Sequence, residues 1–338
     1  MSAEVHVGVA ETLSLVERAL MRAGIAQPAA RSTARALVFA ERDGQKGHGL
    51  SRVATYVEQV RCRKVRADAI AVARRVSPVA IQIDAAYGFA YPAIDLAIEE
   101  LVPMARKSAV AVAAIARSHH FGQAGAHVER LAEAGLVGLL FGNSPKAMAF
   151  WGGKRPMIGT NPIAFAAPLP DGPPLVIDLA VSVAARGKIL AANKSGQTIP
   201  PDWAFDDQGK PTTDAAAALK GSMAPAGGAK GAALALMIEI IAAAVTGSHF
   251  GFEASSFLDT EGSPPGVGQV MIAIEPNALS SGAYLARMAT LLHAMAEEPN
   301  VRQPGSSRIE SRRRAAEKGL SVSTRLLAEI RALAGDAA

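Results

Sequence analysis

Apolar residues recur at helical spacing at the start of the chain. Leu13, Val16 and Leu20 would share one face of a helix, and Gly24 is suited to end it. Two further helices are expected at 28–41 and 51–60, on either side of the polar, glycine-rich segment 42–49. The first 75 or so residues are therefore predicted to be helical.

From Val79 onward, short apolar runs typical of strands alternate with helical segments. Strands are predicted at 79–84, 109–116, 137–141, 162–167, 174–179 and 270–275. Helices are predicted at 92–102 and 124–134, with a long apolar helix at 229–245. The C-terminal part returns to helix at 281–297, 308–318 and 321–333.

Helices at both ends thus flank a mixed α/β middle, and no internal repeat is visible. We expect an α/β fold in which the two termini join to form one helical domain, from residues 1–75 and 285–338. A mixed α/β domain of residues 76–284 would be inserted between them.

Composition narrows the class of protein. Half of the 338 residues are hydrophobic, as in a well-packed globular protein, and the single cysteine, Cys62, excludes an intramolecular disulfide. The net charge of +5 is scattered and only 5% of residues are aromatic, which disfavours nucleic-acid binding. The longest apolar run, 231–247, is interrupted by Glu239 and is too short for a membrane span. With no signal peptide or metal cluster visible, we expect a cytoplasmic protein that handles small anions.

The common nucleotide-binding fingerprints are missing from the sequence. No G-x-G-x-x-G follows a strand, and no G-x-x-x-x-G-K-[ST] is present. Gly266-Val267-Gly268 lacks the third glycine and precedes a strand, which is the wrong context. Any dinucleotide would have to be held by other means.

His48 and Arg52 form the most suggestive pair of polar residues. His48 lies between Gly47 and Gly49, where the open backbone allows close approach of a ligand, and Arg52 follows near the start of a helix. A histidine that moves a proton and an arginine that binds a carboxylate would suit a carboxylic-acid substrate. A loop histidine without catalytic function fits the same pattern.

Several predicted helix starts could attract anions. Ser118–Gly122 lies between a strand and a helix, Lys230 follows two glycines, and Arg308 stands in a first helical turn, where a cation opposes the helix dipole. Asp178 ends an apolar strand and could be a helix cap or a site residue. The turn Gly159–Pro162 is explained by turn chemistry alone.

Taken together, these segments resemble the malate/L-lactate dehydrogenase type 2 family. The resemblance rests on Asp43-Gly44, His48-Gly49, Arg52, Ser118-His119-His120-Phe121-Gly122, Gly152-Gly153, Gly159-Thr160-Asn161-Pro162, Ile177-Asp178-Leu179, Ala185-Arg186-Gly187, Gly227-Gly228, Lys230-Gly231, Pro304-Gly305 and Arg308. They occur in order over nearly the whole chain. The segments 41–44 and 255–259 look most like the Δ1-piperideine-2-carboxylate/Δ1-pyrroline-2-carboxylate reductase branch.

The resemblance implies a non-Rossmann, NAD(P)-dependent oxidoreductase that forms a homodimer. It makes His48 the proton donor, Arg52 the clamp for the substrate carboxylate, and Thr160 a neighbour of the substrate. Around the cofactor it places His120, Phe121, Gly122, Gln123, Ala124, Asp178, Leu179, Ala180, Lys230, Pro304, Gly305 and Arg308, within a segment that continues to Glu310. The branch favours NADPH over NADH.

One position departs from the family pattern. The family usually has serine directly before the catalytic histidine, and this chain has Gly47, which removes a hydroxyl from the site. The leading prediction is NAD(P)H-dependent reduction of a small cyclic 2-imino-carboxylate, Δ1-pyrroline-2-carboxylate or Δ1-piperideine-2-carboxylate, to the L-amino acid. The alternatives are oxidation of a 2-hydroxy acid such as malate, lactate or ureidoglycolate, and a weakened member that only binds nicotinamide or a carboxylate. For a keto acid, we expect His48 to act as an imidazolium that protonates the developing alkoxide.

Overall fold

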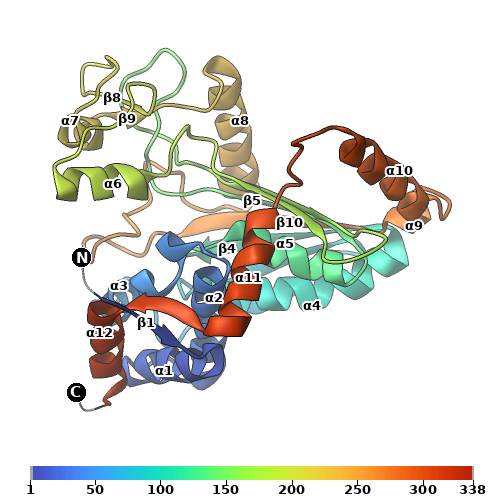
Figure 1. Cartoon of the computed structure of the whole chain (residues 1–338), viewed down its shortest axis with the longest axis horizontal. Coiled ribbons are helices and arrows are strands. Elements are labelled where there is room, and N and C mark those ends of the chain that lie inside the picture. Colours follow the sequence, from blue (N-terminus) through green and yellow to red (C-terminus); the bar gives the residue numbers. More distant parts are fainter. Residues whose placement is uncertain (1–2, 337–338) are drawn as a thin grey trace.

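A seven-stranded mixed sheet lies at the centre of the computed structural model, which describes residues 3–336 (Figure 1). In spatial order its strands are β2 (Val72–Ser77), β3 (Ala80–Asp84), β4 (Val110–Ser118), β10 (Val267–Ile274), β5 (Val137–Gly142), β6 (Ile163–Ala167) and β7 (Leu175–Leu179). The β3–β4 pair is parallel, whereas the other neighbouring pairs are antiparallel. The predicted non-Rossmann mixed sheet is confirmed, since a Rossmann sheet is mostly parallel.

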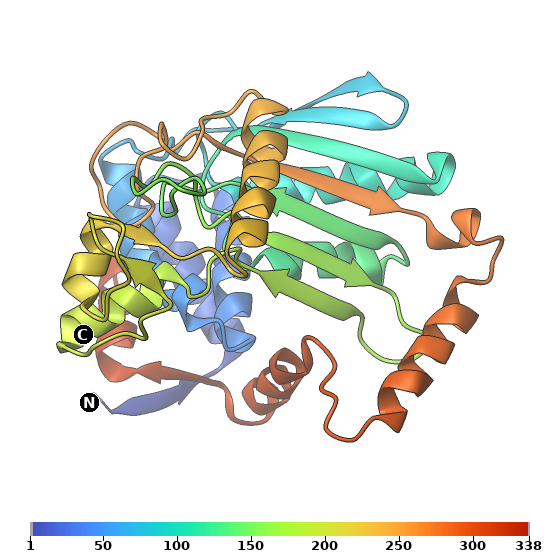
Figure 2. The same cartoon turned by 90° about the horizontal axis from the view of Figure 1, so that it is seen from above.

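Helices cover both faces of this sheet (Figures 1 and 2). On one face lie α4 (Ala90–Ser108) and α5 (Ala124–Glu133), with Ile94, Leu101 and Leu131 fully buried. Across the other face runs α8 (Ala229–Glu239), which continues into the π-helical turn η3 (Ile240–Ala244). The central strand β4 is antiparallel to β10 and ends beside the helical region, so the polar segment after Ser118 faces that region.

The two ends of the chain meet in that helical region. Its elements are β1 (Glu4–Val7), α1 (Val9–Arg22), α2 (Gln27–Arg42), the 3₁₀ turns η1 (Lys46–His48) and η2 (Leu50–Arg52), α3 (Val53–Arg61), α11 (Ser306–Lys318), β11 (Leu320–Ser323) and α12 (Thr324–Ala334). β1 pairs antiparallel with β11, and Leu20, Leu37 and Ile330 belong to one buried apolar cluster. Because chain segments from both termini share that cluster, the catalytic candidates of the first 60 residues are held against α11.

A small lobe stands beyond the sheet, at the upper left of Figure 1. It contains α6 (Arg186–Ser195), β8 (Ala204–Phe205), α7 (Ala215–Lys220) and β9 (Ser222–Met223). A third apolar cluster, with Met148, Ile158 and Ile189, ties it to α8. Its elements are short and weakly patterned, and the sequence analysis predicted none of them.

Several predicted bounds were wrong. β1 and β2 were missed, and the helix predicted from Ser321 begins only at Thr324. Residues before Thr324 form a strand because they pair with β1, while the Ser323 hydroxyl accepts a hydrogen bond from the Leu326 amide and caps α12.

The helix predicted at 281–297 is observed as α10 (Tyr284–Glu297), after the short α9 (Pro276–Leu279). It has no buried residue and projects away from the helical region, at the right of Figure 1. The apolar cluster of the helical region takes its C-terminal members from Ala315 onward. The division into residues 1–75 with 285–338 and 76–284 stays a proposal, and α10 is the part that fits it least.

Candidate active site

The turns η1 and η2 present His48 and Arg52 between α2 and α3. The buried Glu41 carboxylate holds these turns in place, because it accepts a hydrogen bond from the Leu50 amide at 3.0 Å. Burial raises the pKa of Glu41 above its ordinary value. A side chain at position 49 would collide with this carboxylate, so the glycine is required for close packing. Arg52 donates from Nε to the Gly47 carbonyl at 2.7 Å.

His48 belongs to a chain of hydrogen-bonding groups that reaches into the core. Its Nδ1 lies 3.3 Å from Nε2 of His120, and the two rings stack with centroids 5.3 Å apart. Nδ1 of His120 lies 2.6 Å from the Tyr56 hydroxyl, which lies 3.0 Å from the Tyr91 hydroxyl. Since Nδ1 of His48 is engaged by His120, Nε2 is the ring nitrogen left for a substrate.

The histidines of this cluster are neutral at neutral pH. Burial, followed by the nearby Arg52 charge, lowers the pKa of His48 to about 4. The same two causes hold the pKa of His120 well below its ordinary value. Burial also lowers the pKa of His119 to about 3. His48 is therefore neutral in the free protein, whereas the imidazolium expected from the sequence concerned the reaction with a bound keto acid and stays a prediction.

The aromatic rings of His119 and Phe257 pack beside the stacked rings of His48 and His120. The Phe257 ring lies 5.3 Å from the His119 ring and 5.2 Å from the His120 ring. Both ring nitrogens of His119 are buried and have no hydrogen-bond partner among residues 3–336. The loop that carries Phe257 is anchored by Lys64, whose fully buried ammonium donates to the Asp259 carboxylate and to backbone carbonyls.

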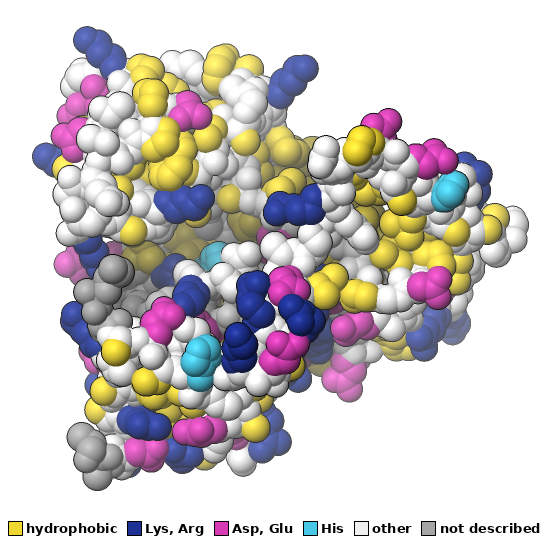
Figure 3. Space-filling model, viewed as in Figure 1, with side chains coloured by type: hydrophobic (Ala, Val, Ile, Leu, Met, Phe, Trp, Pro, Cys, Tyr) yellow, Lys and Arg dark blue, Asp and Glu magenta, His cyan; other side chains and the backbone are white. Residues whose placement is uncertain are grey.

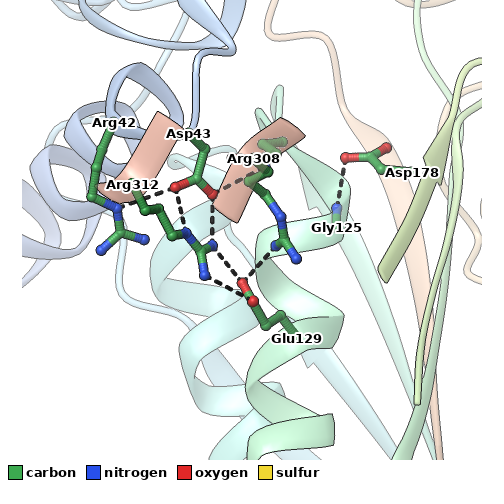
Figure 4. A network of polar contacts seen from close by, with 8 residues as sticks. Arg42, Asp43, Gly125, Glu129, Asp178, Arg308 and Arg312 are labelled. Carbon is green, nitrogen blue, oxygen red and sulfur yellow. Dashed lines mark hydrogen bonds and ion pairs between the residues drawn. The ribbon is translucent and has the colours of Figure 1, made fainter. Parts of the chain in front are cut away.

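A second group of polar residues lies at the start of α5. The Asp178 carboxylate, at the end of β7, accepts a hydrogen bond from the Gly125 amide at 2.7 Å (Figure 4). The surrounding protein raises the pKa of Asp178 although the residue remains accessible to solvent, so the carboxyl lies in a recess. Arg308 lies close by, 5% exposed, and its Nε and Nη2 have no partner among the described residues.

Figure 4 also shows how α11 joins the two parts of the site. Arg312 donates to both oxygens of Asp43 at 2.7 Å and to both oxygens of Glu129 on α5. Arg308 donates to Glu129 at 2.6 Å. Asp43 also accepts from Gln123, which precedes α5, at 3.3 Å. This buried ion-pair network holds the loop before His48 against the loop after His120.

Thr160 lies near the start of the small lobe and of α8. Its amide donates to the Ser144 hydroxyl at 3.1 Å, and its carbonyl accepts from the Val181 amide at 2.8 Å. The Val181 carbonyl accepts in turn from the Ala226 amide, just before α8. The segment after Asp178 thus connects Thr160 to the turn that precedes Lys230.

The candidate residues therefore fall into three groups. His48 and His120 are in direct contact, with Arg52 attached to the same turn. Gln123, Asp178 and Arg308 surround the start of α5, where Ala124 is its first residue and Gly305 precedes α11 at a positive φ. Five others have different surroundings: Phe121 is buried in the sheet core, while Leu179, Ala180, Pro304 and the Lys230 side chain are exposed.

The residues around α5 fit a polar, anionic cofactor. Arg308 offers two buried N–H groups without a protein acceptor, and Gln123 has a buried carbonyl oxygen without a donor. Gly122, at a positive φ, leaves the backbone open before the helix N-terminus. In contrast, residues 3–336 contain no group of three or more His, Cys, Asp or Glu side chains arranged to hold a metal ion.

Sequence reasoning missed several members of this site. Tyr56 follows His48 and Arg52 at intervals of four residues, and this spacing could have identified it. Tyr91, Arg312 and Glu129 meet the site only through tertiary packing, and no local pattern marks them.

The face seen in Figure 3 is hollowed between the small lobe and the helical region, and a histidine side chain is visible inside the hollow. Among residues 3–336, no helix has both the length and the apolar character that a membrane crossing needs.

Comparison with known proteins agrees with this geometry. The family model described as malate/L-lactate dehydrogenase matches residues 7–331. The chain is 50% identical over 334 residues to a (2R)-3-sulfolactate dehydrogenase (NADP(+)) of Chromohalobacter salexigens, covering 99% of both chains. It is 38% identical over 326 residues to a Δ1-pyrroline-2-carboxylate/Δ1-piperideine-2-carboxylate reductase of Pseudomonas aeruginosa, covering 96% of this chain and 97% of the relative.

A solved structure of the same family has the same fold. The crystal structure of Δ1-piperideine-2-carboxylate reductase from Pseudomonas syringae superposes with a TM-score of 0.93 at 33% identity, covering 97% of this chain and 99% of that one. The chain therefore belongs to the malate/L-lactate dehydrogenase family of NAD(P)-dependent oxidoreductases.

Proposed function

We propose that the protein is an NADP-dependent dehydrogenase that interconverts a short 2-hydroxy acid carrying a second anionic group, such as (2R)-3-sulfolactate, with its 2-oxo acid. The relative with that printed activity is 50% identical, against 38% for the cyclic-imine reductase. The observation that carries the chemistry is the pairing of His48 with Arg52. Both Nη groups of Arg52 have no partner among the described residues and can bind a carboxylate in a bidentate manner.

In this proposal, Arg52 fixes the carboxylate so that the C2 oxygen faces Nε2 of His48. In the oxidative direction, His48 accepts the hydroxyl proton as the C2–H bond breaks. In the reductive direction, the transfer is reversed: His48 gives the Nε2 proton to the oxygen that develops from the carbonyl and takes a proton from His120 at Nδ1, so that its ring stays neutral. A nicotinamide held by the residues around α5 would supply the hydride chemistry at C2. His120 holds the His48 ring through Nδ1, which fixes its orientation.

Gly47 supports a substrate with a second acidic group. A Cβ built at Gly47 would have no atom within 4 Å, so there is open space beside His48. The serine hydroxyl that is usual in the family would reduce this space. We therefore interpret Gly47 as an adaptation to a larger anionic substrate.

The residues around α5 would hold the cofactor. The unpartnered N–H groups of Arg308 suit an anionic group, and Asp178 is an acceptor in an accessible recess. We propose NADPH over NADH because the more similar relative carries NADP(+) in its name. Thr160 as a substrate neighbour and the homodimer implied by the resemblance stay predictions, and light scattering of the purified protein tests the dimer.

Reduction of a cyclic 2-imino-carboxylate is the second candidate. It is favoured by the similarity to the two reductases and by the segment 255–259, which carries the family-branch signature. Phe257 of this segment lies against His119 and His120, where an apolar ring could be accommodated. The same Arg52 would bind the carboxylate, and His48 would exchange a proton with the imine nitrogen.

The test is a set of initial rates with purified protein. Oxidation of (2R)-3-sulfolactate, malate and lactate is followed with NADP⁺ and NAD⁺, and reduction of Δ1-pyrroline-2-carboxylate with NADPH and NADH. We expect the highest kcat/KM for sulfolactate with NADP⁺. A higher value for the cyclic imine would establish the second candidate. Turnover of none of them, with NADPH still bound, would favour the weakened member that only binds nicotinamide or a carboxylate.

A further inference from the structure

We infer that Tyr56 and Tyr91 extend the His48–His120 pair into a proton relay that connects the reacting oxygen to a separate water-filled cavity. The inference deepens the proposed function and rests on it, because it concerns the proton that this reaction takes up or releases. Tyr56 and Tyr91 act through His120 and do not touch the substrate.

The geometry supports proton exchange at each step. The successive separations are 3.3 Å from His48 Nδ1 to His120 Nε2, 2.6 Å from His120 Nδ1 to the Tyr56 hydroxyl, and 3.0 Å from there to the Tyr91 hydroxyl. Neutral imidazole and phenol each carry one donor and one acceptor, so all four groups can be ordered in one direction. When Nε2 of His48 holds a proton for the substrate, Tyr91 donates to Tyr56, Tyr56 to His120, and His120 to His48.

The proton balance of reduction follows from this order. His48 releases its Nε2 proton to the substrate oxygen and takes the Nε2 proton of His120 at Nδ1. His120 takes the Tyr56 proton, Tyr56 takes the Tyr91 proton, and Tyr91 takes one from water. One proton enters at Tyr91 and one leaves at His48, and no group carries a lasting charge. The chain then has the reverse order, with Nε2 of His48 free to accept a proton during oxidation.

The cavity lies at the end of this chain. Tyr91 is one of the residues that line a cavity of about 50 Å³, together with Ser32, Asp95, Gln123, His127 and Arg130. This volume is sufficient for water, and Ser32, Asp95 and Gln123 supply hydrogen-bond partners in an otherwise largely apolar lining. Arg35, which also lines it, is 44% exposed at its side chain, so the cavity lies close to bulk solvent.

The surrounding residues keep both tyrosine hydroxyls protonated and leave room for the Tyr91 hydroxyl. Burial raises the pKa of Tyr56 to about 12 and holds that of Tyr91 well above its ordinary value, so both remain protonated hydroxyls. The Tyr91 hydroxyl lies 2.9 Å from where a Cβ of Gly122 would be, and only glycine leaves it room. Substrate and cofactor together exclude water from the open side of the site, which makes a second route for the proton useful.

The relay is tested with Tyr91→Phe, which breaks it at the end distant from the substrate. We expect kcat for reduction to fall about tenfold with KM unchanged, and the solvent deuterium isotope effect on kcat to rise, because proton delivery becomes limiting. Tyr56→Phe should do the same. Tyr284→Phe is the control, since it removes a tyrosine hydrogen bond to Pro168 far from the site and should leave both quantities unchanged. Unchanged kcat and isotope effect in a folded Tyr91→Phe protein would overturn the relay.

A measurement without substrate or cofactor keeps the test independent of turnover and of variant folding. Histidine ¹⁵N NMR of the unsubstituted protein reports which ring nitrogen carries the proton. The relay requires His48 and His120 to share one tautomer, both Nε2–H or both Nδ1–H. Opposite tautomers would overturn it. An inactive protein with matched tautomers would refute the proposed reaction and leave the hydrogen-bonded chain intact.

Discussion

The molecule has two buried polar clusters, a charged one that contains Asp43 and a neutral one that contains His48, and they differ in how their polar groups are stabilised. Around Arg312, charges are kept: Asp43 and Glu129 are fully paired with guanidinium groups. Around His48, charges are lost: burial lowers the histidine pKa values, and the rings are joined by hydrogen bonds to phenols. The fixed charges hold position, whereas the neutral groups can exchange protons. The contrast predicts that one cluster controls stability and the other controls turnover.

In the neutral cluster, we expect the largest loss of activity from His48→Ala. We expect kcat to fall by about 10²- to 10⁴-fold, since the group that exchanges a proton with the substrate is removed. Affinity for NADPH, measured by fluorescence titration, should stay within about twofold, because the residues proposed to hold the cofactor surround α5. Turnover within a few-fold of the unsubstituted protein would remove His48 from its proposed role.

In the charged cluster, the corresponding substitution is Arg312→Met, which we expect to lower stability. It leaves the Asp43 and Glu129 carboxylates buried with fewer partners, and we expect the free energy of unfolding to fall by about 3 kcal/mol. Urea unfolding measures this loss. Arg313→Met is the matched control, because its ion pairs with Glu310 and Glu317 are exposed, and it should unfold like the parent. Equal effects of both substitutions would show that the network has no special role.

Acidification should distinguish the clusters in a second way. His48, His119 and His127 have pKa values of about 4, 3 and 4 in the folded protein, below the ordinary histidine value in the unfolded chain. The unfolded state therefore binds protons first, so their contribution is complete above about pH 6.5 and is lost as pH falls toward 4. We expect the free energy of unfolding to fall steadily over this interval, measured by urea unfolding at fixed salt.

His119→Phe tests the origin of that fall. Phenylalanine keeps the aromatic contacts with Tyr56 and Phe257 and removes two buried, unpartnered nitrogens, so stability at pH 7 should rise by about 1 kcal/mol. The gain should grow at pH 5, because a group that resists protonation has been removed. The exposed His293→Gln should change neither value. A destabilised variant at both pH values would mean that His119 has a polar partner in solution.

The same contrast explains what the sequence could predict. The strands β4 and β10 followed from their apolar runs, and His48 with Arg52 from their glycine-rich setting, because these signals are local; the mixed order of the sheet came only from the family resemblance. The partners of His48 come from elements 8 to 72 residues away, and only packing of α3, α4 and β4 brings them together. The low pKa of His48 depends on that packing too, so its neutral state in the free protein could not be predicted from the sequence. Arg308 was found by its place in a first turn, but its partner Glu129 was not.

The smallest expected effect comes from Gly47→Ser, which adds the usual family hydroxyl beside His48. The side chain has open space, so stability should not change. If Gly47 makes room for a second anionic group, kcat/KM for sulfolactate should fall by up to about tenfold while that for lactate or the cyclic imine is kept or rises. Gly47→Ala separates the two contributions, since it fills the space without the hydroxyl. A general gain with serine for every substrate, absent with alanine, would instead identify Gly47 as a weakened site in which His48 lacks a hydrogen-bonding partner.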